Sequence, residues 1–129
     1  MNYLFLVAFI FTSYCAQAQN FSGNYNQIIN IDDGGVIVYE LTLNPSGRFE
    51  FHFYRKLICK ICKEENQYGK GTWRQEGKYI FFTTESTDLN ENYTLDFTNS
   101  KARFHKSETN LLFTESNIYW IEKKQLAKL

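Results

Sequence analysis

Two runs of alternating side chains around a short turn constrain the fold of this chain more than any other feature. Residues 36–43 read VIVYELTL and residues 48–54 read RFEFHFY. Apolar or aromatic side chains recur at every second position, which is the period of a half-buried β-strand. The four residues between the runs, 44–47, read NPSG, in which proline presets φ and glycine accepts a positive φ. Together the runs and the turn predict a β-hairpin.

The alternation also assigns the faces of the second strand of this hairpin. Phe49, Phe51 and Phe53 share one face, which we expect to be buried, because a strand has a side-chain period of two. Glu50 and His52 fall on the opposite face, toward water or a polar lumen.

Similar runs follow one another along the rest of the chain at intervals typical of antiparallel all-β proteins. Nine strands are predicted, at residues 21–29, 36–43, 48–54, 68–75, 78–84, 93–98, 102–106, 111–115 and 118–122. They indicate an antiparallel up-and-down meander closed into a barrel, with a two-sheet β-sandwich as the alternative. Only residues 122–129, with their charges and leucine spacing, resemble a short helical turn.

A separate apolar run at residues 3–11 precedes Ala16-Gln17-Ala18. The run is too short to span a bilayer as a helix, and small residues before a cut are what a signal peptidase requires. The sequence therefore predicts a signal peptide over residues 1–18 and one exported domain, secreted or periplasmic, over residues 19–129. Lipid attachment at Cys15 is disfavoured, because Tyr14 stands where a small residue is needed.

The charge balance excludes some classes of partner. The chain has 14 basic and 14 acidic residues and is formally neutral. A nucleic-acid-binding domain is expected to carry a basic face, so we expect no nucleic acid partner. No apolar run after the first is long enough to span a membrane, so we expect no membrane span.

Three stretches resemble the small lipocalin-like (calycin-type) barrels of exported bacterial proteins. Residues 41–49, LTLNPSGRF, are similar to their "L-x-L-n-x-x-G-x-F" hairpin, and residues 71–80 to their "G-t-W … g … I" hairpin. Residues 21–25 are similar to their opening "G-x-W/Y" strand. The resemblance covers about residues 21–84 and implies a closed barrel. Its motif and core positions are Gly23, Tyr25, Gly47, Phe49, Phe51, Gly71 and Trp73.

Within that group, the copper-resistance and envelope-stress lipoprotein barrels carry a Cys-x-x-Cys. This chain has one at Cys59 and Cys62, but it follows the first hairpin, whereas in those proteins it precedes the equivalent strand. The lipid-attachment motif is also missing. The resemblance therefore implies the barrel and not the copper or stress-signalling role.

Cys59 and Cys62 are the residues whose side chains most clearly offer reactive or bond-forming chemistry. In an extended strand their Cα atoms would lie about 10 Å apart, too far for a disulfide, so a bond requires the segment to turn. An exported protein meets an oxidising environment, which favours a disulfide that staples the 57–67 loop. The alternatives are a redox-active pair, whose thiol pKa nearby lysines would lower, a metal site, and two free or intermolecular cysteines.

Other titratable residues form no recognisable catalytic or metal-binding motif. We expect His52 and His105 to be polar-face residues, and the carboxylates to lie on the solvated face of the sheet. Those carboxylates are Glu40, Glu50, Glu85 and Asp96. The chain has no phosphate-binding glycine loop, nucleophile elbow or zinc-protease motif, so we expect neither an enzyme nor a cofactor.

These observations favour a non-enzymatic exported barrel that binds a small apolar ligand or a protein partner. Aromatic side chains are expected to fill the barrel and to leave little internal room. They are Phe49, Phe51, Phe53, Trp73, Phe82 and Phe97. The loops at 57–67 and 85–92 are the longest and are where a partner would bind. The alternative is a thiol-redox or metal-handling protein that uses Cys59 and Cys62.

Overall fold

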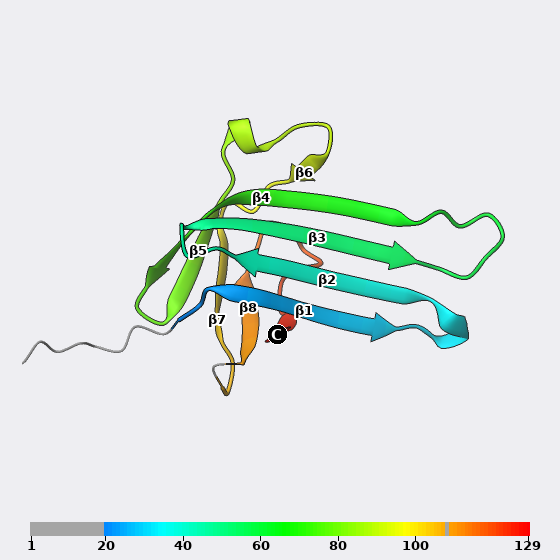
Figure 1. Cartoon of the computed structure of the whole chain (residues 1–129), viewed down its shortest axis with the longest axis horizontal. Coiled ribbons are helices and arrows are strands. Elements are labelled where there is room, and N and C mark those ends of the chain that lie inside the picture. Colours follow the sequence, from blue (N-terminus) through cyan, green and yellow to red (C-terminus); the bar gives the residue numbers. More distant parts are fainter. Residues whose placement is uncertain (1–19, 108) are drawn as a thin grey trace, which may run out of the picture.

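In the part of the chain that the structure describes, there are nine strands and two 3₁₀ turns, η2 and η3 (Figure 1). The computed structural model describes residues 20–107 and 109–129, apart from the side chain of Asp33. The expected signal peptide, residues 1–18, lies outside the described residues. The elements are β1 (Gly23–Asn30), η2 (Asp32–Gly34), β2 (Val36–Leu43), β3 (Arg48–Lys56), β4 (Glu65–Glu76), β5 (Tyr79–Thr83), η3 (Ser86–Asp88), β6 (Tyr93–Leu95), β7 (Ser100–Phe104), β8 (Asn110–Glu115) and β9 (Gln125–Lys128).

Eight of the strands close into an antiparallel barrel. Around the ring, β1, β2, β3, β4, β5, β7, β8 and β9 each pair with their neighbours, and β9 returns to β1. The predicted meander is confirmed, and the β-sandwich alternative is wrong because β3 pairs with both β2 and β4 and leaves no sheet edge there. The ninth strand, β6, leaves the meander and lies parallel to β4, with which Tyr93 and Leu95 pair.

The C-terminal prediction is wrong in two respects. Residues 118–122 form turns rather than a strand, and Gln125–Lys128 is strand β9 rather than part of a helix. In β9 only Leu126 is buried, while Gln125 and Ala127 are exposed, which is a strand pattern. Because β9 bonds to β8 on one side and to β1 on the other, barrel closure outweighs the local helical propensity of so short a segment.

The core has the predicted side-chain period. Phe49, Phe51 and Phe53 of β3 are all buried, and the residues between them are not. They pack in edge-on and tilted pairs with aromatic residues of other strands and loops, for example Phe49 with Phe97, which follows β6, at 5.1 Å between ring centroids. Trp73 is the exception among the aromatics expected to fill the barrel, since it is only partly buried and packs against the rim of the core.

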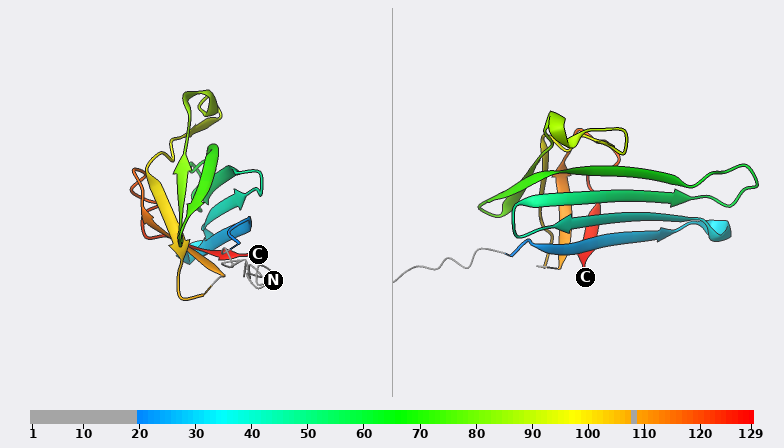
Figure 2. Two further views of the ribbon diagram at one scale, coloured as in Figure 1. Left: turned by 90° about the vertical axis from the view of Figure 1, so that its left-hand side faces the viewer. Right: turned by 45° about the horizontal axis from the view of Figure 1, so that its top comes forward.

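The first four strands run well beyond the barrel, as Figure 1 and the right-hand view of Figure 2 show. β7, β8 and β9 cross only the halves of β1 to β4 that belong to the barrel, and they do not reach the halves that end in the loops at 31–35 and 57–64. We call the distal halves the extension: Gln27–Asn30 of β1, Val36–Tyr39 of β2, Phe53–Lys56 of β3 and Glu65–Gln67 of β4. The extension is an open four-stranded sheet that ends in the loops at 31–35 and 57–64.

Candidate binding cleft at the open end of the barrel

The inner face of the four long strands changes character from the barrel to the extension. Residues directly opposite one another across an antiparallel sheet point to the same side. In the barrel, one such row is Tyr25, Leu41, Phe51 and Gly69. The next row toward the extension is Gln27, Tyr39, Phe53 and Gln67, and the last is Ile29, Ile37, Arg55 and Glu65. An apolar interior therefore gives way to one that mixes aromatic, amide and charged side chains.

A cleft of about 310 Å³ lies on this inner face. The sheet forms one wall, and the connection between β8 and β9 forms the other through Tyr119 and Trp120. The sheet residues that line it are Ile37, Tyr39, Phe53, Arg55, Glu65 and Gln67. Tyr119 and Trp120 belong to the segment predicted as a strand, residues 118–122, so part of that segment forms a wall of the cleft.

Trp120 holds this wall against the sheet. Its ring lies 4.9 Å from that of Phe53, 6.1 Å from that of Tyr39 and 6.2 Å from that of Phe51, measured between centroids. The Lys124 ammonium lies 5.3 Å above the Tyr39 ring, within the range of a cation–π contact. The connection folds back here through turns closed by Ile121 N–H to the Ile118 carbonyl at 3.0 Å and Lys124 N–H to the Ile121 carbonyl at 2.9 Å.

Polar groups are placed at defined points around these rings. Arg55 and Glu65 form an ion pair across the outer end of the cleft, and Gln67 Nε2 donates to Glu65 Oε1 at 2.8 Å. Gln27, in the same row as Tyr39, has a buried Oε1 with no hydrogen-bond partner among the described residues. Burial raises the pKa of the Tyr39 hydroxyl, and the nearby Arg55 guanidinium partly opposes that rise.

The residues of the motifs that resemble the barrel family have roles in turns and close packing. Gly47 closes the β2–β3 turn at φ 90°, where its carbonyl accepts from Trp73 N–H at 2.8 Å. Trp73 Nε1 donates to the Asn44 carbonyl at 3.0 Å and ties this turn to β4. At Gly71 a Cβ would lie 2.1 Å from the Thr83 carbonyl oxygen, so only glycine fits.

The motif residues of β1, Gly23 and Tyr25, lie at the end of the barrel where the β2–β3 turn is, since Gly23 pairs with Leu43. Gly23 begins β1 at φ 140°, and Tyr25 donates from its hydroxyl to the Phe21 carbonyl at 2.6 Å. Burial raises the pKa of Tyr25 to about 12. Tyr25 is therefore a packed and hydrogen-bonded core residue that lies in the barrel row next to the cleft.

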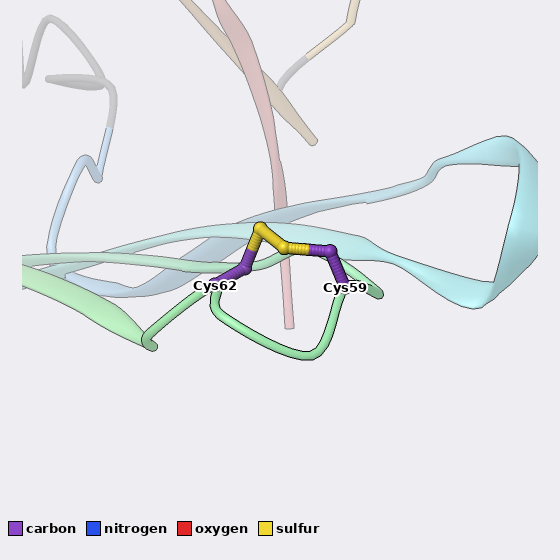
Figure 3. Close-up of a disulfide and its surroundings, with 2 residues drawn as sticks. All are labelled: Cys59 and Cys62. Carbon is purple, nitrogen blue, oxygen red and sulfur yellow. A yellow bond between two sulfur atoms is a disulfide. The ribbon is translucent and has the colours of Figure 1, made fainter.

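Cys59 and Cys62 form a disulfide at the far tip of the extension (Figure 3). The segment turns, as a bond requires, with Cys62 N–H to the Cys59 carbonyl at 3.3 Å and a Cα–Cα distance of 5.2 Å. Both residues are exposed, as is the whole loop 57–64 that holds them. The predicted disulfide is confirmed; the loop is shorter than predicted, because β4 already begins at Glu65.

Of the histidines and carboxylates singled out in the sequence, Glu40, Glu50 and His52 line one pocket of about 180 Å³, and Glu85, Asp96 and His105 are not among its lining residues. Glu40, Glu50, Glu85 and Asp96 are exposed. His52 lies on the outer face of β3, where its ring stacks on Tyr68 at 4.5 Å and its nitrogens contact Glu40 and Asn66. His105 is on a separate turn, where its N–H donates to the Asn110 carbonyl. Within residues 20–107 and 109–129, no group of three or more metal-ligating side chains is positioned to hold an ion.

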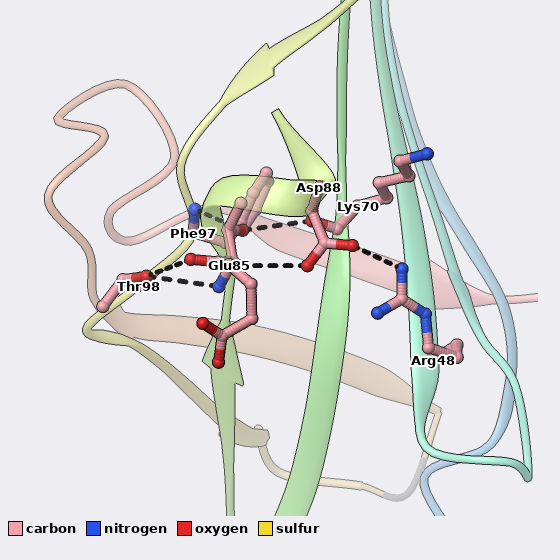
Figure 4. Close-up of polar contacts among 7 residues, drawn as sticks. Arg48, Lys70, Glu85, Asp88, Phe97 and Thr98 are labelled. Atoms are coloured by element: carbon pink, nitrogen blue, oxygen red, sulfur yellow. Dashed lines mark hydrogen bonds and ion pairs between the residues drawn. The ribbon is translucent and has the colours of Figure 1, made fainter. Parts of the chain in front are cut away.

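One polar residue that the sequence did not single out is Asp88, in the 85–92 loop (Figure 4). Its carboxylate accepts from Arg48 Nη2 at 2.7 Å and from Glu85 N–H at 3.0 Å, and it is almost fully buried. The Arg48 hydrogen bond holds the pKa of Asp88 below its usual value. The sequence signal was the spacing of Glu85 and Asp88, which form a capping box around η3.

Comparison with known proteins gives no relative: no protein-family model, no curated protein and no solved structure matches this chain. The lipocalin-like family assignment thus remains a prediction, whereas the barrel is observed. Among the helices that the described residues form, none has the length and apolar character needed to cross a membrane.

Proposed function

We propose that this protein is a non-enzymatic, exported binding protein whose cleft at the open end of the barrel takes a small, largely apolar ligand with one polar end. The observation that carries the proposal is the cleft itself, in which three aromatic rings, Tyr39, Phe53 and Trp120, stand beside the Arg55–Glu65 ion pair and the Gln67 amide. Ligand sites are commonly concave, mostly apolar and furnished with a few placed polar groups.

The surrounding chemistry narrows the class of ligand. The barrel interior next to the cleft is filled by Phe51, Phe97 and their neighbours, so a ligand lies at the mouth and not deep inside. A flat aromatic or short branched body would pack between Phe53 and Trp120. Arg55, which already pairs with Glu65, can also donate a hydrogen bond to an anionic oxygen at the polar end of the ligand.

Binding of 1-anilinonaphthalene-8-sulfonate, an aromatic anion, tests the cleft. We expect saturable, one-to-one binding to the native protein and at least about a tenfold loss of affinity in Trp120→Ala, since a buried aromatic anchor dominates such sites. The matched control is Phe81→Ala, because Phe81 lies on the outer side of β5 beneath the Arg74 guanidinium. Near-ultraviolet circular dichroism checks that each variant keeps its tertiary structure.

Equal dye affinity in Trp120→Ala and the unaltered protein would overturn the proposed cleft. Export is tested separately, by locating the protein after expression in a Gram-negative host and by sequencing its N-terminus. We expect a mature chain that begins at Gln19. An intact Met1 would contradict the export prediction and would leave the cleft proposal standing.

The alternative function, thiol-redox or metal handling, rests on the exposed Cys59–Cys62 disulfide. That bond lies at the tip of the extension and shares no residue with the cleft. Titration with reduced glutathione and with a zinc salt discriminates the two functions. A bond that glutathione reduces readily, or one stoichiometric metal ion, would favour the alternative; a bond that resists reduction and binds no metal favours a structural staple.

A further inference from the structure

Strand β1 has an unpaired edge. On one side it pairs with β2 along its whole length, from Gly23 to Asn30. On the other side it pairs with β9 only at Tyr25 and Asn26, because β9 turns away toward β8. Within the described part of the chain, Gln27–Asn30 therefore has no strand on its outer side, and Figures 1 and 2 show this segment as the lower border of the extension.

The hydrogen bonds to β9 show which backbone N–H and C=O groups of β1 point away from β2, toward the free edge of the sheet. Leu129 N–H donates to the Asn24 carbonyl at 2.8 Å, so Asn24 directs its backbone polar groups toward β9. These groups alternate in direction along a strand, so Asn26, Ile28 and Asn30 point the same way. Asn26 is paired with Ala127. Among residues 20–107 and 109–129, no strand pairs with the N–H and C=O groups of Ile28 and Asn30 on this side, so they form a short template for another strand.

The two free edges of the extension differ in how they are protected. At the β4 edge, Glu65 carries a charge, and Lys63 and Glu64 precede it directly. Charged residues on an edge strand are a common device against edge-to-edge association. The β1 edge reads Gln-Ile-Ile-Asn and contains no charge and no proline. Its Ile28 side chain is 57% exposed on the outer face.

We propose that two copies of this chain associate through β1, by antiparallel pairing of Gln27–Asn30 around a two-fold axis at Ile29. In that register Ile28 of each copy lies opposite Asn30 of the other, and each such pair exchanges both of its N–H···O bonds. The register uses all the outward backbone groups that β9 leaves free. A two-fold interface requires a self-complementary patch, which this uncharged segment is.

Several features favour a second copy over an unrelated strand as the occupant. The segment is its own complement in the register above, and Ile28 gains a neighbouring side chain on the outer face. The formal net charge of the chain is zero, so long-range repulsion does not keep two copies apart. The contact is short, and we expect a weak, concentration-dependent dimer rather than an obligate one.

Sedimentation equilibrium over a range of concentrations measures this association. The unaltered protein should show a monomer–dimer equilibrium, and Ile28→Lys should weaken it by at least about tenfold, since a lysine on an edge strand opposes pairing. The matched control is Asn66→Lys, which places the same charge in the same outer-face row at the opposite edge of the sheet. It should leave the association constant unchanged.

The register is tested by cross-linking in a Cys15→Ser background with diamide as oxidant. Ile29→Cys should give a disulfide-linked dimer, because a residue on the axis faces its own copy at a Cα–Cα distance of about 4.5 Å. Ile28→Cys faces Asn30 and should remain mostly monomeric. A protein that is monomeric at every concentration, or a dimer equally strong in Ile28→Lys, would overturn the proposal; a dimer that cross-links through Ile28→Cys instead would overturn the register.

Discussion

The extension continues four of the eight strands of the barrel, with the same side-chain period and continuous registers, yet the barrel is packed and the extension is open. In β3, Phe49 and Phe51 fill the barrel, Phe53 stands at the boundary, and Arg55 follows on the same inner face. The opposite residues on β4 change in step, from Gly71 and Gly69 to Gln67 and Glu65. Glycine gives way to long polar side chains where the facing strands end.

This difference shows that alternation and residue identity carry separate information. Alternation sets which face is inner along the whole strand. The identity of the inner residues, and the presence of β7 to β9 opposite them, decides whether that face becomes core or cleft. The four predictions that follow test this division, beginning with the largest effect.

Phe51→Ala should cost about 3–5 kcal/mol of the free energy of unfolding, because it leaves a cavity among rings that cannot close around it. Phe53→Ala, at the boundary and facing the cleft, should cost less, because water can enter the space it vacates. Urea denaturation followed by circular dichroism measures both. The control is His52→Ala, on the outer face of the same strand. It should change the free energy of unfolding much less than Phe51→Ala does. Equal losses for Phe51→Ala and Phe53→Ala would show that the extension is packed like the barrel.

The sequence predicted what depends on local pattern. The first hairpin, its turn at Gly47 and the buried face of β3 follow from alternation over adjacent residues. Apart from the closure of the barrel, what depends on distant partners was not predicted. β9 is a strand in the closed barrel because β1, at the other end of the chain, pairs with it, and Trp120 is in the cleft because it packs on the distant Phe53. The Arg48–Asp88 pair likewise joins residues 40 positions apart.

Asp88→Asn should lower the free energy of unfolding of the protein by about 1–3 kcal/mol. The substitution removes the charge of a nearly buried carboxylate that accepts hydrogen bonds from Arg48 and from the Glu85 N–H. The effect should depend on pH. Since the pKa of Asp88 is lowered in the folded state, its stabilisation is present above the unfolded pKa and is lost as the pH falls through the folded value. Urea unfolding at pH 7 and at pH 3 should thus show the gap between the two proteins narrowing in acid. Binding at the open cleft should be unaffected in Asp88→Asn.

Replacing both Cys59 and Cys62 by serine should cost about 2 kcal/mol or less, because a disulfide across so short a loop restricts few conformations of the unfolded chain. We expect the barrel to remain folded and amide hydrogen exchange to rise in the loop 57–64 and the adjoining ends of β3 and β4. If a protein partner binds this loop, the variant loses that binding before it loses stability. Global unfolding of the variant would show that the loop belongs to the core and would remove the distinction between barrel and extension.

Two tyrosines, one on each side of the boundary, give the smallest and most local test. Tyr25→Phe should cost about 1 kcal/mol at pH 7, because the Phe21 carbonyl loses its donor. The pKa of Tyr25, about 12 when folded, lies above that of an unfolded tyrosine, so its neutral form contributes stability that is complete below pH 10 and is lost as the pH rises toward 12.

The pKa of Tyr39 is also raised, but Arg55 opposes the rise, so tyrosinate absorbance should show Tyr39 ionising before Tyr25. Comparison of Tyr25→Phe and Tyr39→Phe assigns the two steps. A ligand in the cleft should raise only the step that Tyr39→Phe removes, and a ligand that shifted both steps equally would place its site inside the barrel.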